Sequence, residues 1–112
     1  MFGMKRTLYH ITPTENLPSI FIRGLIPTVG ERSSDKGRIL PAVHCFSSAA
    51  ALAGAGSAWA LGNFSRHEQV SILEVRADAV VNGGEARVCY IIPPKDIRVI
   101  EEDELTEILR RY

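Results

Sequence analysis

Prolines and glycines interrupt this chain of 112 residues so often that only short helices and strands fit between them. A β-prone run at residues 6–12 stops at Pro13, and the apolar segment that follows ends at Gly24, a natural helix terminus. Asn82-Gly83-Gly84 is a strong turn signal, and Pro93-Pro94 closes the strand predicted after it. Helical and extended segments therefore follow one another without the regular βαβ alternation of a parallel sheet, and the sequence predicts an α+β fold.

The pattern of apolar residues predicts where these short elements lie. Strands are expected at residues 6–12, 42–46, 70–75, 85–92 and 97–100. Helices are expected between Asn16, as N-cap, and Gly24, from Ser47 or Ser48 to Leu61, and at residues 101–112, with a loop rich in glycine and serine at 28–37. A chain of this length buries one core, so residues 1–112 are expected to form a single domain.

Charge and cysteine content limit the classes of function. The 13 Lys and Arg balance the 13 Asp and Glu, and a neutral chain is poorly suited to a sequence-independent grip on nucleic acid, although its N-terminal third is locally basic. Cys45 and Cys89 lack zinc-site spacing, and two free, buried thiols are expected in a reducing compartment. The apolar runs are too short for a signal peptide or a membrane span, so we expect a cytoplasmic protein with no membrane partner, although a toxin exported by a dedicated machine would have the same features.

His10 and Thr12 lie two residues apart on the first predicted strand, so their side chains project from the same face. Two polar groups placed this way suit the hydroxyls of a sugar, although a hydrogen-bonded histidine at a sheet edge is the plainer interpretation. In the segment 24–34, Arg32 and Ser33 could hold phosphate, but the segment matches neither a GxGxxG nor a Walker pattern. An ordinary solvated loop is the alternative there.

Residues 42–48, AVHCFSS, pass from a predicted strand into a helix, where backbone N–H groups could bind an anion. Ser47 and Ser48 are equally suited to ordinary helix capping. His44 and Cys45 are neighbours on a strand and face opposite sides of it, which argues against a thiolate–imidazole pair.

Glu85 begins an otherwise apolar strand directly after the predicted turn. A carboxylate in that place could border a ligand cleft. It could also be a plain surface charge paired with Arg87, and the sequence leaves both interpretations open.

Three stretches together resemble the ADP-ribosyltransferase-like fold, the group of poly(ADP-ribose) polymerases, DNA-modifying ADP-ribosylating toxins and RNA 2′-phosphotransferases. LYHIT followed by NLPSIFIRGLIP resembles the first strand and helix of that group, AVHCFSS its second motif, and EARVCYIIPPKDI the strand that often carries a catalytic Glu. The resemblance extends from Leu8 to about Ile100. It implies a small split mixed or antiparallel sheet with a few short helices, and NAD-dependent transfer of ADP-ribose to a protein or a nucleic acid.

The resemblance also implies how NAD would be held. His10 would bond a ribose hydroxyl on the adenosine side, and the backbone of Ile11, where a glycine is common, would hold the nicotinamide amide, with Thr12 close by. Glu85 would bond the 2′-hydroxyl of the other ribose and stabilise the positive charge that develops as nicotinamide leaves. The remaining residues implied for NAD are Arg32, Ser33, Phe46, Ser47 or Ser48, and Trp59, with Phe46 or Trp59 in place of a usual tyrosine.

Other functions stay open on the sequence alone. An RNA 2′-phosphotransferase-like enzyme needs RNA contacts for which this chain lacks the length and the charge. A non-catalytic NAD-binding or protein-interaction module would keep the fold without the chemistry, as would follow if Cys89 rather than Glu85 stood at the Glu position. A metal hydrolase built on His10, His44 and Cys45 has no recognisable ligand spacing.

Overall fold

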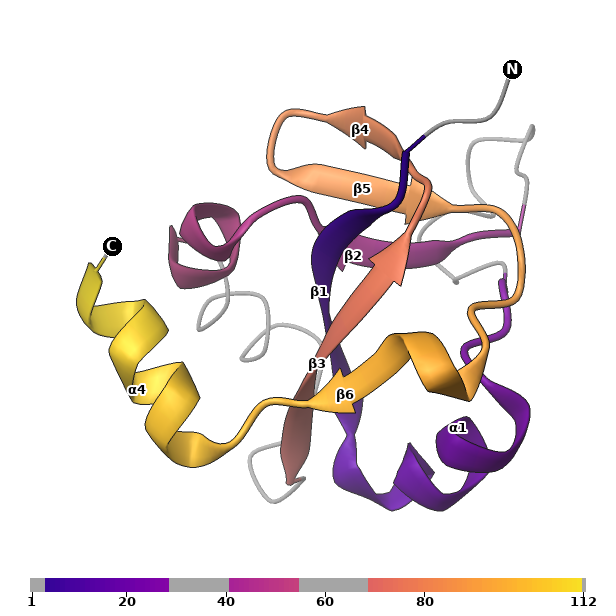
Figure 1. The fold of residues 1–112 in the computed structure, drawn as a ribbon, viewed down its shortest axis with the longest axis horizontal. Coiled ribbons are helices and arrows are strands. Elements are labelled where there is room, and N and C mark those ends of the chain that lie inside the picture. Colours follow the sequence, from indigo (N-terminus) through magenta and orange to yellow (C-terminus); the bar gives the residue numbers. More distant parts are fainter. Residues whose placement is uncertain (1–3, 29–40, 55–68, 112) are drawn as a thin grey trace.

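The computed structural model describes residues 4–28, 41–54 and 69–111, and its strands form one six-stranded sheet with the order β4-β5-β2-β1-β3-β6 (Figure 1). All paired neighbours in this sheet are antiparallel, so the predicted α+β class is confirmed and the antiparallel form of the sheet is the one observed. The strands are β1 (Arg6–Pro13), β2 (Val43–Phe46), β3 (Val70–Ala77), β4 (Val80–Asn82), β5 (Glu85–Val88) and β6 (Ile97–Val99). The helices are α1 (Leu17–Arg23), α4 (Glu102–Arg111) and one beginning at residue 49 and described to 54, with 3-10 turns η1 (Thr14–Asn16) and η2 (Pro94–Asp96).

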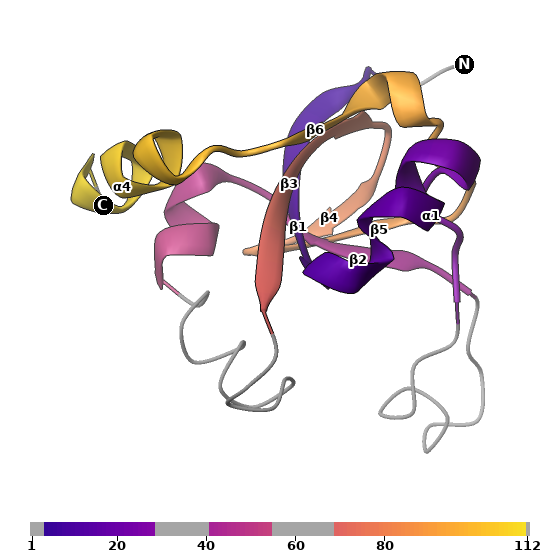
Figure 2. The ribbon, with the colours of Figure 1, turned by 90° about the horizontal axis from the view of Figure 1, so that it is seen from below.

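The sheet divides where β1 meets β2. β1 pairs with β3 along its whole length, from Arg6–Ala77 to Pro13–Val70, whereas its described register with β2 is the single pair Tyr9–Phe46. Figures 1 and 2 show β4, β5 and β2 running across the direction of β1 and β3. We therefore distinguish a β1 half (β1, β3 and β6) from a β2 half (β2, β4 and β5), and call the point where the strands part, beyond Tyr9 and Phe46, the β1–β2 fork.

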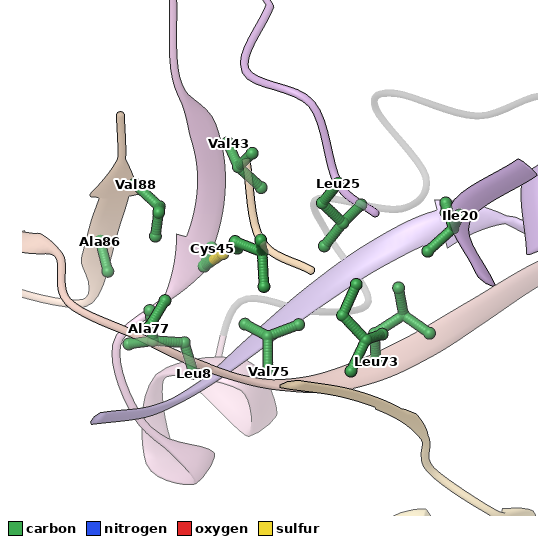
Figure 3. Packing of buried hydrophobic residues seen from close by; sticks show 12 residues of the cluster. Leu8, Ile20, Leu25, Val43, Cys45, Leu73, Val75, Ala77, Ala86 and Val88 are labelled. Atoms are coloured by element: carbon green, nitrogen blue, oxygen red, sulfur yellow. The ribbon is translucent and has the colours of Figure 1, made fainter. Parts of the chain in front are cut away.

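The hydrophobic core joins the two halves (Figure 3). Alternate residues of each strand face inward, as the two-residue period of a strand requires, and each fully buried aliphatic side chain contributes about 1.5–3 kcal/mol. The β1 half supplies Leu8, Leu73, Val75, Ala77 and Ile97, the β2 half supplies Val43, Cys45, Ala86 and Val88, and Ile20, Leu25 and Ile92 complete the cluster.

The N-terminal helix has the predicted bounds but lacks the predicted capping hydrogen bond. α1 begins at Leu17 with Pro18 in the first turn and Asn16 at the N-cap position, but the Asn16 side chain makes no hydrogen bond to the helix. Asn16 instead belongs to η1, and its Nδ2 donates to Thr12 Oγ1 at 3.4 Å. The Thr12 hydroxyl is thereby engaged within the fold, which the spacing of His10 and Thr12 did not reveal.

The strand predicted at 85–92 ends early, at Val88. Ile92 leaves the β2 half and pairs with Leu25, each backbone N–H donating to the other residue's carbonyl at 2.9 and 3.0 Å. β4 was not predicted, because its three residues are all exposed and show no alternation. It pairs with β5 across the predicted turn, which is therefore a hairpin turn.

The two cysteines lie in different environments, contrary to the expectation that both are buried. Cys45 is in the core, and burial raises the pKa of its thiol to about 12, so it stays protonated and is no nucleophile at neutral pH. Cys89 is exposed, because β5 has already ended at Val88. Both are free thiols, as expected.

α4 is attached to the β1 half through a charged contact. Its first turn is acidic and its last turn basic, as predicted, and none of its described residues is buried. Arg98 of β6 donates to both carboxylate oxygens of Glu104, at 2.6 and 3.0 Å, and to Glu74 at 2.9 Å. These hydrogen bonds raise the pKa of Arg98 and lower that of Glu104. No helix in the described ranges is long and apolar enough to cross a membrane.

Gly24 fixes the exit from α1. Its backbone (φ 85°, ψ −175°) lies in a region restricted almost entirely to glycine. An added Cβ would overlap the carbonyl oxygen of Ile92, which accepts the hydrogen bond from the Leu25 N–H. The turn after α1 thus depends on the absence of a side chain at residue 24.

We expect Gly24→Ala to lower the free energy of unfolding by about 2–3 kcal/mol, because the substitution adds a clash to the backbone strain. Gly83→Ala is the matched control, since Gly83 has φ 62° but open space around it, and should lose only about 1 kcal/mol. Urea denaturation of both variants measures the difference. Equal losses would show that the contact with Ile92 is unimportant.

Candidate functional site

The backbone of Ile11 faces the β1–β2 fork. Hydrogen-bonded and non-hydrogen-bonded pairs alternate along an antiparallel ladder, and the Thr14 N–H donates to the Gln69 carbonyl at 2.9 Å. Because every second residue of β1 is hydrogen-bonded to β3, Thr12 and His10 form such pairs as well. Ile11 lies between them, so its N–H and C=O point away from β3. The peptide groups of Ile11 therefore point towards the side of β1 from which β2 diverges.

His10 lies at the same fork and is held in one tautomer. Its Nδ1 is 2.7 Å from the backbone oxygen of His44, and since a carbonyl can only accept, Nδ1 carries the proton. Nε2 of the neutral ring is consequently an acceptor. An imidazole fixed in this way can accept a hydrogen bond from a hydroxyl group, as the sequence interpretation requires.

The neutral form of His10 is favoured by its surroundings. Burial lowers the pKa of His10 below its ordinary value of 6.5, the hydrogen bond to the His44 carbonyl offsets part of this effect, and the nearby His44 imidazole lowers the pKa further. At neutral pH the ring is therefore an uncharged donor and acceptor.

The lowered pKa of His10 has a consequence for stability. Well above pH 6.5 the ring is neutral in both the folded and the unfolded chain, so it contributes no pH dependence there. As the pH falls below that value, the unfolded chain takes up the proton first, and the folded state loses stability until the lowered pKa of the folded protein is passed. We expect His10→Asn, whose Nδ2 can still donate to the His44 carbonyl, to lose less stability on acidification.

Thermal denaturation from about pH 7.5 to about pH 5 tests this expectation. Carboxyl groups titrate alike in both proteins, so the relevant quantity is the difference between the two slopes of melting temperature against pH. Identical slopes would mean that His10 takes up its proton equally readily in the folded and the unfolded chain.

The other face of the fork carries Glu85 and His44. Glu85 lies opposite Phe46, at the start of β5, and its Oε1 is 3.3 Å from Nδ1 of His44. Both side chains are accessible, with 58% and 44% of their respective surfaces exposed. The sequence interpretation of Glu85 as a surface charge paired it with Arg87, but the side-chain contact that the structure shows for Glu85 is with His44. Arg87 lies directly opposite His44 in the register.

His10 and Glu85 do not share a face of the sheet. Residues opposite one another in a ladder project from the same side, which places His10 with the buried Leu73 and places Glu85 with Phe46 and Tyr9. The two are linked around the fork by His44, whose carbonyl contacts His10 and whose ring contacts Glu85. A ligand that touches both must therefore cross the fork.

The two serines after β2 have structural roles. Ser47 donates from its backbone N–H to the Gly84 carbonyl at 3.0 Å and from Oγ to the Gly83 carbonyl at 2.8 Å. It thereby ties the end of β2 to the turn that precedes Glu85. Ser48 accepts the Ala51 N–H at 3.1 Å, so the capping interpretation is correct for this residue.

Several predicted features lie outside the described residues. These are Arg32, Ser33, Trp59 and the greater part of the loop at 28–37. Within the described ranges, no group of three or more His, Cys, Asp and Glu could hold a metal ion.

A hollow of about 300 Å³ is lined by residues of β3, β6 and α4 and of the segment between β6 and α4. Its lining is mainly apolar and contains none of the predicted site residues: Val70, Ser71, Ile72, Val99, Ile100, Glu102 and Leu105. Of the predicted site residues that the structure describes, His10, Ile11, Phe46 and Glu85 lie beside the fork, and none lines this hollow.

His44 is the residue that sequence reasoning undervalued. It was considered only as a partner of Cys45 or as a metal ligand, because its contacts with His10 and Glu85 join strands distant in the sequence. The alternation of β2 did carry one signal, since it placed His44 on the face opposite the buried Cys45.

Comparison of the chain with protein-family models, curated proteins and solved structures finds no match to any of them.

Proposed function

We propose that this protein binds NAD across the β1–β2 fork and transfers ADP-ribose from it to a macromolecular acceptor. The observation that carries the proposal is the neutral, single-tautomer His10 beside the peptide groups of Ile11, which point away from β3 towards the fork. Nε2 of His10 could accept a hydrogen bond from a ribose hydroxyl. The N–H and C=O of Ile11 could pair with the oxygen and the NH₂ group of a carboxamide. An antiparallel sheet that opens between two strands is also consistent with the ADP-ribosyltransferase-like resemblance.

Glu85 is the residue that we propose for the transfer step. In that step the bond between ribose C1′ and the nicotinamide nitrogen breaks, and nicotinamide leaves with the electron pair. The ribose becomes oxocarbenium-like until an oxygen or nitrogen of the acceptor attacks C1′ and loses its proton. A carboxylate held at the start of β5 would bond the 2′-hydroxyl and stabilise the positive charge.

Binding is the first part of the proposal to test. We expect calorimetric titration of NAD to show saturable binding, weakened about 10-fold or more in His10→Ala, the equivalent of one lost hydrogen bond. Thr7→Ala is the matched control, because Thr7 is an exposed residue of the same strand. If the wild type does not bind NAD, or if both variants bind as it does, the fork is not an NAD site.

Turnover is the second part. Water can replace the acceptor, so release of nicotinamide from NAD measures the chemical step without knowledge of the natural acceptor. We expect Glu85→Gln to lower kcat by about 100-fold or more with little change in the Kd of NAD, while the exposed Glu101→Gln retains wild-type activity. Binding that depends on His10, without turnover in the wild type, would favour the non-catalytic NAD-binding module.

A further inference from the structure

His44 makes contact with both halves of the candidate site, through two different parts of the residue. Its backbone oxygen accepts the hydrogen bond from His10 Nδ1 at 2.7 Å, and its side-chain Nδ1 lies 3.3 Å from Glu85 Oε1. We propose that His44 is a positioning residue, whose carbonyl holds the His10 imidazole and whose side chain orients the Glu85 carboxylate. This inference rests on the proposed function for its catalytic consequence, but not for the contacts themselves.

The carboxylate needs such an orienting contact. Glu85 is 58% exposed and stands directly after a turn that contains two glycines, so its side chain would otherwise sample several rotamers in water. The turn is already tied to β2 by Ser47, and the His44 imidazole fixes the carboxylate itself. Preorganising a charged group before the reaction is the usual way in which a site stabilises a developing charge.

Among the described residues, the charged and titratable groups next to His44 that the contacts identify come from two strands. Glu85 and Arg87 face it from β5, and the His10 imidazole faces it from β1. Of these, Glu85 is the group whose carboxylate lies within hydrogen-bond distance of the His44 ring. A carboxylate oxygen can only accept a hydrogen bond, so this contact requires a proton on Nδ1 of His44.

The two contacts of His44 can be tested separately by mutation, because one is made by its backbone and the other by its side chain. Replacing the side chain of residue 44 leaves its carbonyl in β2, so the contact with His10 should survive while the contact with Glu85 is lost. His44→Phe removes the donor and suits an exposed strand position. His44→Asn is the conservative variant, because its Nδ2 takes the place of Nδ1 and can donate to Glu85.

Steady-state kinetics of nicotinamide release give the first test. We expect His44→Phe to lower kcat on the order of 10-fold at nearly unchanged KM, and His44→Asn to recover most of the loss. In a Glu85→Gln background, His44→Phe should have no further effect, because both changes remove the same oriented carboxylate. Three results would overturn the proposal. They are an equal loss of kcat in His44→Phe and His44→Asn, a change in KM alone, and a further loss of kcat when His44→Phe is added to Glu85→Gln.

A second measurement does not depend on NAD. Imidazole nitrogen signals in NMR spectra report which ring nitrogen is protonated and what it contacts. We expect Glu85→Gln to move the His44 Nδ1 signal and leave the His10 signals in place, and His44→Phe to leave His10 protonated at Nδ1. A His44 signal unaffected by Glu85→Gln would refute the positioning role even if NAD is turned over. If Glu85→Gln shifts the His44 Nδ1 signal but the protein does not bind NAD, the proposed function is refuted and the contact between His44 and Glu85 is not.

Discussion

The divergence of β2 from β1 beyond the Tyr9–Phe46 pair is the constraint on which the rest of the site depends. Had the ladder continued, Ile11 and His44 would have formed its next hydrogen-bonded pair, and the backbone groups at the fork would have been used within the sheet. Because the strands part, the His44 carbonyl is available to the His10 imidazole, and a side chain takes the role of a ladder donor. The same event that opens the sheet therefore also selects the tautomer of the histidine beside it.

The core explains why the strands can part without loss of the fold. Leu8 and Val75 of the β1 half and Cys45 and Val88 of the β2 half belong to one buried cluster, so apolar contact between the halves compensates for the missing ladder. His10 lies on this inner face, where a charged imidazole would lower the stability of the fold. Its neutral form follows from the same packing that holds the halves together.

Much of the fold could be predicted from the sequence, because its signals are local. Pro13, Gly24 and the Asn82-Gly83-Gly84 turn marked element ends correctly, and the α+β class followed from their order. The errors occurred where tertiary pairing overrides local preference: Ile92 pairs with Leu25 instead of extending β5. At the site, the sequence pointed to His10 and Glu85 but could not show that they lie on opposite faces of the sheet, since faces follow from strand register and not from spacing.

The strand pairings also determine the order in which such a chain can fold. β4 and β5 are joined by a tight turn and can pair early. β1, in contrast, pairs with β3, and this pairing brings together residues as distant in the sequence as Arg6 and Ala77. Closing a long loop before any contact is gained is slow, and the pairing of β1 with β3 joins the residues that lie furthest apart in the sequence. The fork, which needs β1, β2 and β5 together, is thus assembled only once nearly the whole sheet exists. A truncated or nascent chain that still lacks β3 therefore has His10 but no fork.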